Sequence, residues 1–141
     1  MAAGRIPMKQ AFLLTIASLL SILFMTLHMA DDIVRGMEPG TTADLVVVPI
    51  LVIWLYGTLM LAERRSGYII TLLGSLLGAT VTVIHFNGAR GVAGGEIAKS
   101  SGALFFVWTL VALGVTSVFA FLLSVRGLWR LPRDRSRKSG A

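Results

Sequence analysis

The sequence contains no cysteine among its 141 residues. This absence excludes disulfides, thiolate metal sites, iron–sulfur clusters and any thiol redox mechanism, and it leaves the redox compartment undetermined. Charged side chains are also scarce, at 14% of the chain, whereas hydrophobic residues make up 55% and the mean hydropathy is +0.81. A soluble domain with a polar surface could hardly accommodate this balance. The composition therefore indicates an integral membrane protein.

Recognised catalytic and nucleotide-binding motifs are missing as well. The sequence shows no serine–histidine–acid signature, phosphate-binding loop, dinucleotide fingerprint or internal repeat, and neither histidine stands in an HExxH motif. No resemblance to a known family is evident from motifs. Function must therefore be inferred from the arrangement of polar residues within the membrane domain.

Four intervals without any formal charge are long enough to cross a bilayer. They contain 21, 18, 24 and 26 residues and follow Lys9, Asp44, Arg65 and Lys99, respectively. A spanning helix needs about 20 mostly apolar residues, because a rise of about 1.5 Å per residue must cover roughly 30 Å of hydrocarbon. We therefore expect an all-α, up-down-up-down bundle in residues 1–126, followed by a basic, disordered tail in 127–141. The four transmembrane helices are expected near residues 11–28, 45–62, 68–86 and 103–125.

Basic residues are distributed unevenly between the two ends of this bundle. With a cytoplasmic N-terminus, ten of the 13 Lys and Arg residues lie in cytoplasmic segments, and the outer loops hold only Arg35, Arg90 and Lys99. This bias follows the positive-inside rule. We therefore predict a protein of the plasma (inner) membrane with both termini in the cytoplasm, N-in/C-in. The net charge of +6 then reflects topology, and no nucleic-acid partner is expected.

Membrane lipids are the first expected partners. Basic residues near the C-terminus would contact anionic headgroups, at about 1 kcal/mol per residue close to the surface. These residues are Arg130, Arg133, Arg135, Arg137 and Lys138. Gly74 and Gly78 form a GxxxG spacing that lets a neighbouring backbone approach closely. We expect the two glycines to pack helices within the chain; a homo-oligomer or a larger membrane complex is the alternative.

Two polar stripes end in the two histidines. Reading backward from each histidine in steps of three and four gives Thr15, Ser18, Ser21, Met25 and His28, continuing to Asp32, and Thr71, Ser75, Gly78, Thr82 and His85. Residues at this spacing lie on one face of a helix, so the stripes should face the bundle interior. The first and third helices run in the same direction, so both histidines should reach the outer end together.

A polar mouth at this end is the candidate site. Its expected members are His28, Asp31, Asp32, His85 and Glu96. His28, Asp32 and His85 offer two imidazoles and one carboxylate, a ligand set that suits zinc or non-haem iron. Haem held by the two histidines is a less favoured alternative, because it leaves Asp32 without a role. Simple hydrogen bonding among these side chains would also explain them.

Three classes of function follow from this site. The favoured hypothesis is a non-enzymatic binding or accessory component, which asks least of the sequence. The alternatives are a metal-dependent membrane enzyme, with His28, Asp32 and His85 as ligands and Glu96 or Asp31 as a general base, and a haem-binding or small transporter subunit. All acidic residues lie at the ends of the spans, which disfavours proton-coupled transport. The sequence does not decide whether the protein is an enzyme.

Overall fold

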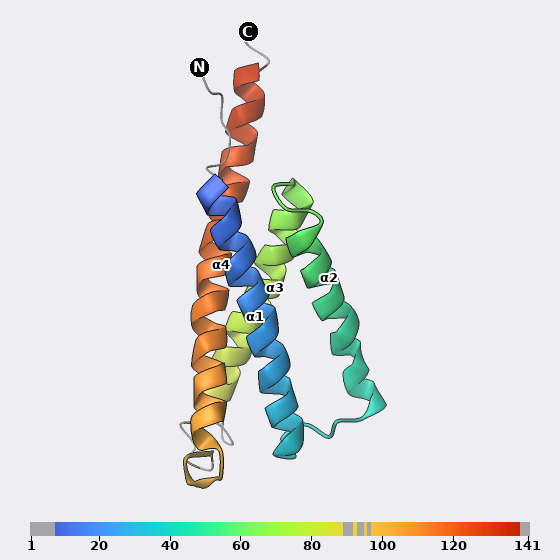
Figure 1. Cartoon of the computed structure of the whole chain (residues 1–141), viewed down its shortest axis with the longest axis vertical. Helices are drawn as coiled ribbons and strands as arrows, with labels where there is room; N and C mark the ends of the chain where they lie inside the picture. The colour runs from blue at the N-terminus through green and yellow to red at the C-terminus, as the bar shows by residue number, and fades with distance from the viewer. Residues whose placement is uncertain (1–7, 89–91, 93–94, 96, 139–141) are drawn as a thin grey trace.

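The structure, a computed structural model, describes residues 8–88, 92, 95 and 97–138. Its elements are α1 (Met8–Val34), the 3₁₀ helix η1 (Thr42–Val46), α2 (Val47–Leu59), α3 (Arg65–Asn87), the 3₁₀ helix η2 (Ile97–Lys99) and α4 (Ala103–Lys138). The described residues contain no strand, which confirms the predicted all-α class. α1 begins and α4 ends at the same end of the bundle (Figure 1).

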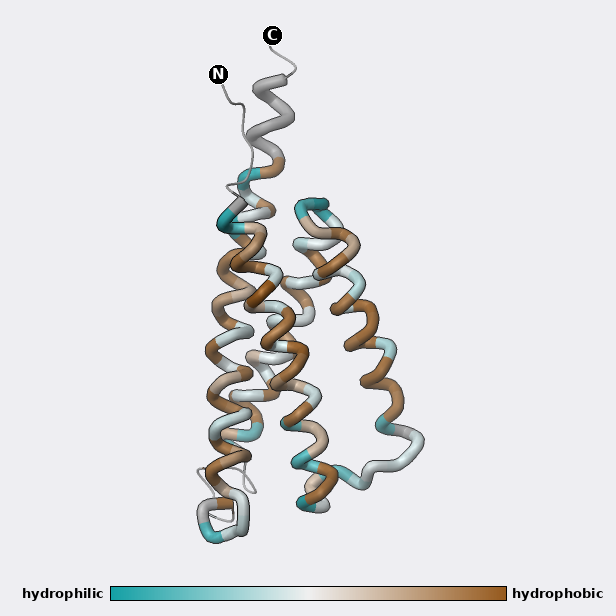
Figure 2. The backbone as a smooth tube through the Cα atoms, viewed as in Figure 1, coloured by the Kyte–Doolittle hydropathy of each residue, from teal (hydrophilic) through white to brown (hydrophobic). Residues whose placement is uncertain are grey.

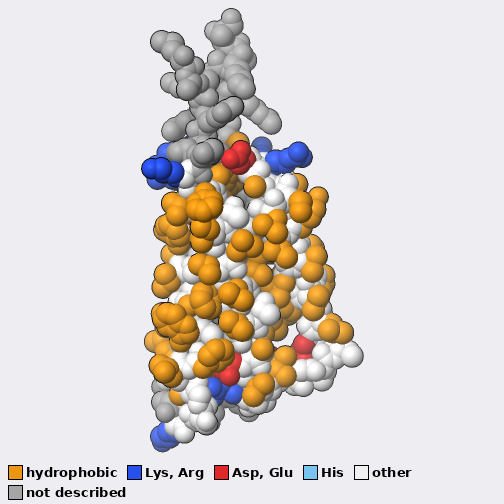
Figure 3. All heavy atoms as spheres, viewed as in Figure 1, with side chains coloured by type: hydrophobic (Ala, Val, Ile, Leu, Met, Phe, Trp, Pro, Cys, Tyr) orange, Lys and Arg blue, Asp and Glu red, His pale blue; other side chains and the backbone are white. Residues whose placement is uncertain are grey.

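Three of the helices are long and apolar enough to cross a membrane. The corresponding segments are Lys9–Val34, Arg65–Asn87 and Ala103–Leu131. Hydrophobic residues dominate the middle of each helix, and hydrophilic residues gather toward the ends (Figure 2). On the face shown in Figure 3, hydrophobic side chains form a broad band between charged residues at the two ends. This exposed apolar band fits contact with lipid, as the length and composition of the three helices do.

The second helix is shorter than predicted. α2 has 13 residues, about 20 Å of helix, instead of the expected 45–62. Its first part is wound as η1, where the backbone N–H of Thr41 donates to Asp44 Oδ2 over 2.7 Å. Pro49 lies in the first turn of α2, where its missing N–H has no helical partner to lose. The whole apolar element therefore runs only from Asp44 to Leu59.

The fourth helix is longer than predicted. It continues to Lys138 instead of ending at Val125, so residues 127–138, expected to be a disordered tail, are helical. Leu128 and Leu131 explain part of this difference, because they pack against the buried cluster around Leu14 and Tyr68. The basic residues that follow Val125 therefore do not mark the end of the fold.

Small residues allow the helices to approach one another. A Cβ atom on Gly74 would collide with the ring of Trp54 on α2, and one on Gly78 would collide with Ser117 on α4. The two glycines therefore serve two different contacts within the chain, as the intrachain interpretation requires. Trp54 also donates its indole N–H to Ser18 Oγ on α1 over 2.9 Å. α2 is thus fixed to both α1 and α3 near the middle of the bundle.

Candidate metal centre

His28 and Asp32 stand one turn apart near the end of α1. Their i,i+4 spacing places both side chains on the same face of the helix. That face points inward: the side chain of His28 is fully buried and that of Asp32 is 4% exposed. Ser18, Ser21 and Met25 of the predicted stripe are buried too, and Thr15 is half-buried. The helical pattern therefore predicted the orientation of this segment correctly.

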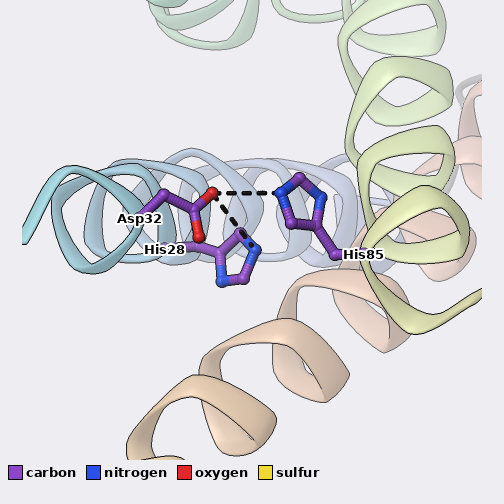
Figure 4. A group of neighbouring side chains, drawn as sticks. All are labelled: His28, Asp32 and His85. Carbon is purple, nitrogen blue, oxygen red and sulfur yellow. Dashed lines mark ion pairs between the residues drawn. The ribbon is translucent and has the colours of Figure 1, made fainter. Parts of the chain in front are cut away.

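His85 comes from α3 and meets the same carboxylate. Its Nε2 lies 3.2 Å from Asp32 Oδ2, and Nε2 of His28 lies 3.7 Å from that same oxygen. Figure 4 shows one nitrogen of each imidazole turned toward the same carboxylate oxygen of Asp32. The ring centroids of the histidines are 4.9 Å apart. The predicted meeting of His28, Asp32 and His85 therefore occurs in the structure.

The hydrogen bonds of the two Nδ1 atoms fix the tautomers of the histidines. Nδ1 of His85 lies 3.0 Å from the carbonyl oxygen of Val81, which can only accept, so this nitrogen carries the hydrogen. Nδ1 of His28 lies 3.4 Å from Thr109 Oγ1, a long contact. The Thr109 hydroxyl donates to the carbonyl oxygen of Phe106, so it accepts from His28. In the neutral rings, both Nε2 atoms then present lone pairs toward Asp32.

Thr109 and Phe106, both on α4, are members of the site that the sequence interpretation missed. Both are fully buried, and the Phe106 ring centroid lies 4.8 Å from that of His28 and 6.3 Å from that of His85. A signal for Thr109 was present in the sequence. Thr109, Ser117 and Ser124 recur at steps of eight and seven and are all buried. α4 carries no histidine, so stripes that start from the two histidines do not include this face.

Asp31, another predicted member of the mouth, does not join this cluster. Asp31 forms an ion pair with Arg35, with 2.7 Å between Oδ2 and Nε. Arg35 also donates from a terminal nitrogen to Ser100 Oγ over 2.7 Å and lies over the Phe106 ring, 5.4 Å from its centroid. Asp31 is therefore neutralised and directed away from the histidines. Glu96 lies outside the described residues.

Predicted lipid contacts of the basic C-terminal segment are only partly covered by the structure. Arg130 donates to Gln10 Oε1 over 3.0 Å, so this side chain joins α4 to α1. The side chains of Arg133, Arg135, Arg137 and Lys138 lie outside the described residues.

The three site residues leave polar atoms without partners. Nε2 of His28 and Oδ1 of Asp32 are buried and have no hydrogen-bond partner among the described residues. An unpaired polar atom in the interior costs about 1–3 kcal/mol, and an uncompensated buried carboxylate costs several. A proton on His85 would compensate the charge of Asp32 but would leave Nε2 of His28 unsatisfied. One cation between the three residues would satisfy both needs.

The spacing of the three atoms suits a small metal ion. One ligand atom from each of His28, Asp32 and His85 lies within 4.8 Å of the others. Bonds of about 2.0–2.2 Å to a tetrahedral zinc ion separate neighbouring ligand atoms by roughly 3.4 Å, close to the 3.2 and 3.7 Å seen here. The Nδ1–H bonds to Val81 and Thr109 resemble the outer hydrogen bonds that orient metal-binding histidines.

Haem does not fit between the same histidines. A macrocycle would have to separate the two rings, but they meet edge to face at an interplanar angle of 82°. Both Nε2 atoms also approach one carboxylate oxygen instead of facing each other across a gap. The geometry thus disfavours the haem alternative.

Comparison of the chain with protein-family models, curated proteins and solved structures finds no match.

Proposed function

We propose that this chain is a small integral membrane protein that binds one divalent transition-metal ion through Nε2 of His28, Oδ2 of Asp32 and Nε2 of His85. The observation that carries the proposal is the convergence of two imidazole Nε2 atoms on one buried carboxylate oxygen. Two nitrogen ligands and one oxygen ligand suit zinc, and two histidines with one carboxylate also suit iron(II). The proposal specifies the favoured hypothesis of a non-enzymatic binding component, because it names a metal ion as the ligand.

The proposal includes a membrane orientation. With four spans, N-in/C-in, the metal centre lies at the outer side of the inner membrane. Ten of the 13 basic residues support this orientation through the positive-inside rule. α2 would cross as a short, apolar element together with η1, which requires local thinning of the bilayer or tilting of its neighbours.

Metal analysis of purified protein tests the proposal. Protein purified without chelator, or reloaded with zinc and dialysed, should contain about one equivalent of metal per chain. His28→Ala, Asp32→Ala and His85→Ala should each reduce bound metal to background, because each removes a ligand. Asp31→Asn is the matched control, since Asp31 is the adjacent acid on α1 and pairs with Arg35. Equal zinc retention by the control and all three ligand variants would refute the site.

Cobalt substitution adds a geometric readout. Cobalt(II) bound by two nitrogens and one oxygen in a tetrahedral site should give visible absorption bands that the Asp32→Ala variant lacks. Retained bands in that variant would place the metal elsewhere. Circular dichroism of each variant in detergent confirms that the helices still form.

A further inference from the structure

A groove between α2 and α3 is not used by the metal centre itself. Its volume is about 320 Å³ and its walls are almost wholly apolar. Ile50, Ile53 and Trp54 line it from α2, and Ile70, Leu73 and Leu77 line it from α3. α2 leans away from α1 and α3 toward the end that carries the metal centre (Figure 1). The size lies at the lower end of the range for small-molecule pockets, enough for one hydrocarbon chain.

On α3 the lining of the groove ends at Leu77, two turns of helix before His85. Leu77, Val81 and His85 follow one another in steps of four, so they lie along one side of the helix. The distance from Leu77 to His85 is about 12 Å of helix. His85 is also the most accessible ligand: its side chain is 20% exposed, against 0% for His28 and 4% for Asp32. A chain that extends from the groove past Val81 along this side of α3 would reach a metal at His85.

The direct route from the aqueous side is covered. Arg35 bridges Asp31 on α1 and Ser100, which precedes α4, and its guanidinium lies over the Phe106 ring. Phe106 in turn packs against both imidazoles. The arginine and the phenylalanine cover His28, so among the three described ligands the partly exposed His85 offers the most open approach.

The net charge of the metal centre determines which head group such a molecule should carry. A divalent ion with one carboxylate and two neutral imidazoles carries a net charge of +1, and the nearby Arg35 is neutralised by Asp31. Three protein ligands leave a fourth coordination position open. A monoanionic oxygen ligand would fill this position and neutralise the centre. A carboxylate is the smallest lipid head that supplies both properties.

We propose that the α2–α3 groove binds the chain of a long-chain carboxylate whose head coordinates the metal beside His85. This inference rests on the proposed metal site and specifies the class of ligand that it takes. The metal acts as an electrostatic anchor for the head, and the groove selects a single hydrocarbon chain. Binding of the head and of the chain should therefore depend on each other.

Quenching of tryptophan fluorescence by brominated stearate tests this inference. Trp54 lines the groove, whereas Trp108 and Trp129 are exposed on the lipid-facing surface. A Trp108→Phe, Trp129→Phe background leaves Trp54 as the reporter. In zinc-loaded protein, dibromostearate should quench Trp54 saturably and plain stearate should compete. The methyl ester of dibromostearate lacks the anionic head, so half-maximal quenching should need at least about a tenfold higher concentration of the ester than of the acid. Half-maximal quenching of metal-free protein by the acid should need a similar increase.

Variants of the groove complete the experiment. Leu77→Phe should fill the groove and weaken quenching by about tenfold or more, whereas Leu76→Phe, on an exposed neighbouring position, should not change it. Zinc content is measured on the same samples. Bound zinc with equal quenching by acid and ester, or with no effect of Leu77→Phe, would overturn the inference and leave the metal site intact. Absence of bound zinc would overturn both proposals.

Discussion

Nε2 of His85 on α3 lies 3.2 Å from Oδ2 of Asp32 on α1, inside a bundle whose surface is mainly apolar. This contact explains why α1 and α3 can each carry a polar stripe without exposing it to lipid. The stripes face inward, and a carboxylate with two imidazoles closes them at one end. Buried ionisable groups in a membrane domain are costly and usually functional. The predictions below separate a metal centre from a merely structural polar contact.

Replacing Thr109 by valine should weaken metal binding without removing a ligand. The Thr109 hydroxyl accepts from Nδ1 of His28 and so helps to orient Nε2 toward the site. Loss of such an outer contact typically reduces metal affinity by about 10–100-fold, and the long 3.4 Å distance favours the lower figure. Zinc titration with a competing chromophoric chelator measures the change. Thr116→Val, whose hydroxyl bonds only within α4, should bind zinc as the native chain does.

Asp32→Asn should make the metal-free protein more stable but should abolish the stabilisation of the protein by zinc. In chelator, the variant should be more stable than the native chain by about 1–3 kcal/mol, because it removes an uncompensated buried charge. Its amide can also donate to Nε2 of His85. With excess zinc, only the native chain should gain stability. Thermal unfolding in detergent, with and without zinc, measures both effects.

Asp31→Asn is the control for this comparison. It breaks a partly buried ion pair with Arg35 and should cost about 1 kcal/mol or less. Its stabilisation by zinc should match that of the native chain. If Asp32→Asn lowers the stability in chelator, the carboxylate is already compensated in the metal-free protein, and the physical argument for a cation would fail.

Gly74→Ala and Gly78→Ala should each destabilise the bundle without changing its oligomeric state. The added methyl group meets the Trp54 ring in the first case and Ser117 in the second. Overpacking of this kind costs roughly 1–3 kcal/mol. Unfolding by SDS measures stability, and light scattering measures mass. Thr80→Ala, at an exposed position of α3, should alter neither. A change in mass together with the loss of stability would favour the glycines as an oligomer contact.

The sequence predicted correctly those features that depend on which face of a single helix is buried. Charge-free intervals located the helices, and steps of three and four from His28 and His85 found the buried face of α1 and of α3. The same spacing separates the two neighbouring acids, because Asp32 stands four residues after His28 whereas Asp31 falls off that face. The side chain of Asp31, also expected in the mouth, turns to Arg35, and that of Asp32 turns to the histidines.

Features that depend on packing between helices do not follow from the charge pattern and the two histidines, which located the spans and the site. Thr109 belongs to the site because α4 packs against both α1 and α3, and no histidine on α4 marked the right face. The length of α4 depends on Leu128 and Leu131 meeting residues of α1 and α3. The shortness of α2 follows from the winding of its first turn as η1. Local charge patterns carry none of this information.

Cysteine labelling should establish the topology, since the native chain contains no cysteine. Thr42→Cys and Ser66→Cys place single thiols at exposed positions before and after α2. With four spans and cytoplasmic termini, a membrane-impermeant maleimide should label residue 42 in intact spheroplasts. It should label residue 66 only after the membrane is permeabilised. Each thiol serves as the accessibility control for the other.

The labelling pattern also decides whether the short α2 crosses the bilayer. Its apolar stretch from Asp44 to Leu59 is shorter than the usual span of about 20 residues, so it needs a thinned bilayer or tilted neighbours. If α2 instead lies along one surface, both thiols should react from the same side. The chain would then have three spans, and its two ends would lie on opposite sides of the membrane. Labelling of residues 42 and 66 from opposite sides of the membrane supports four spans and an outer metal centre.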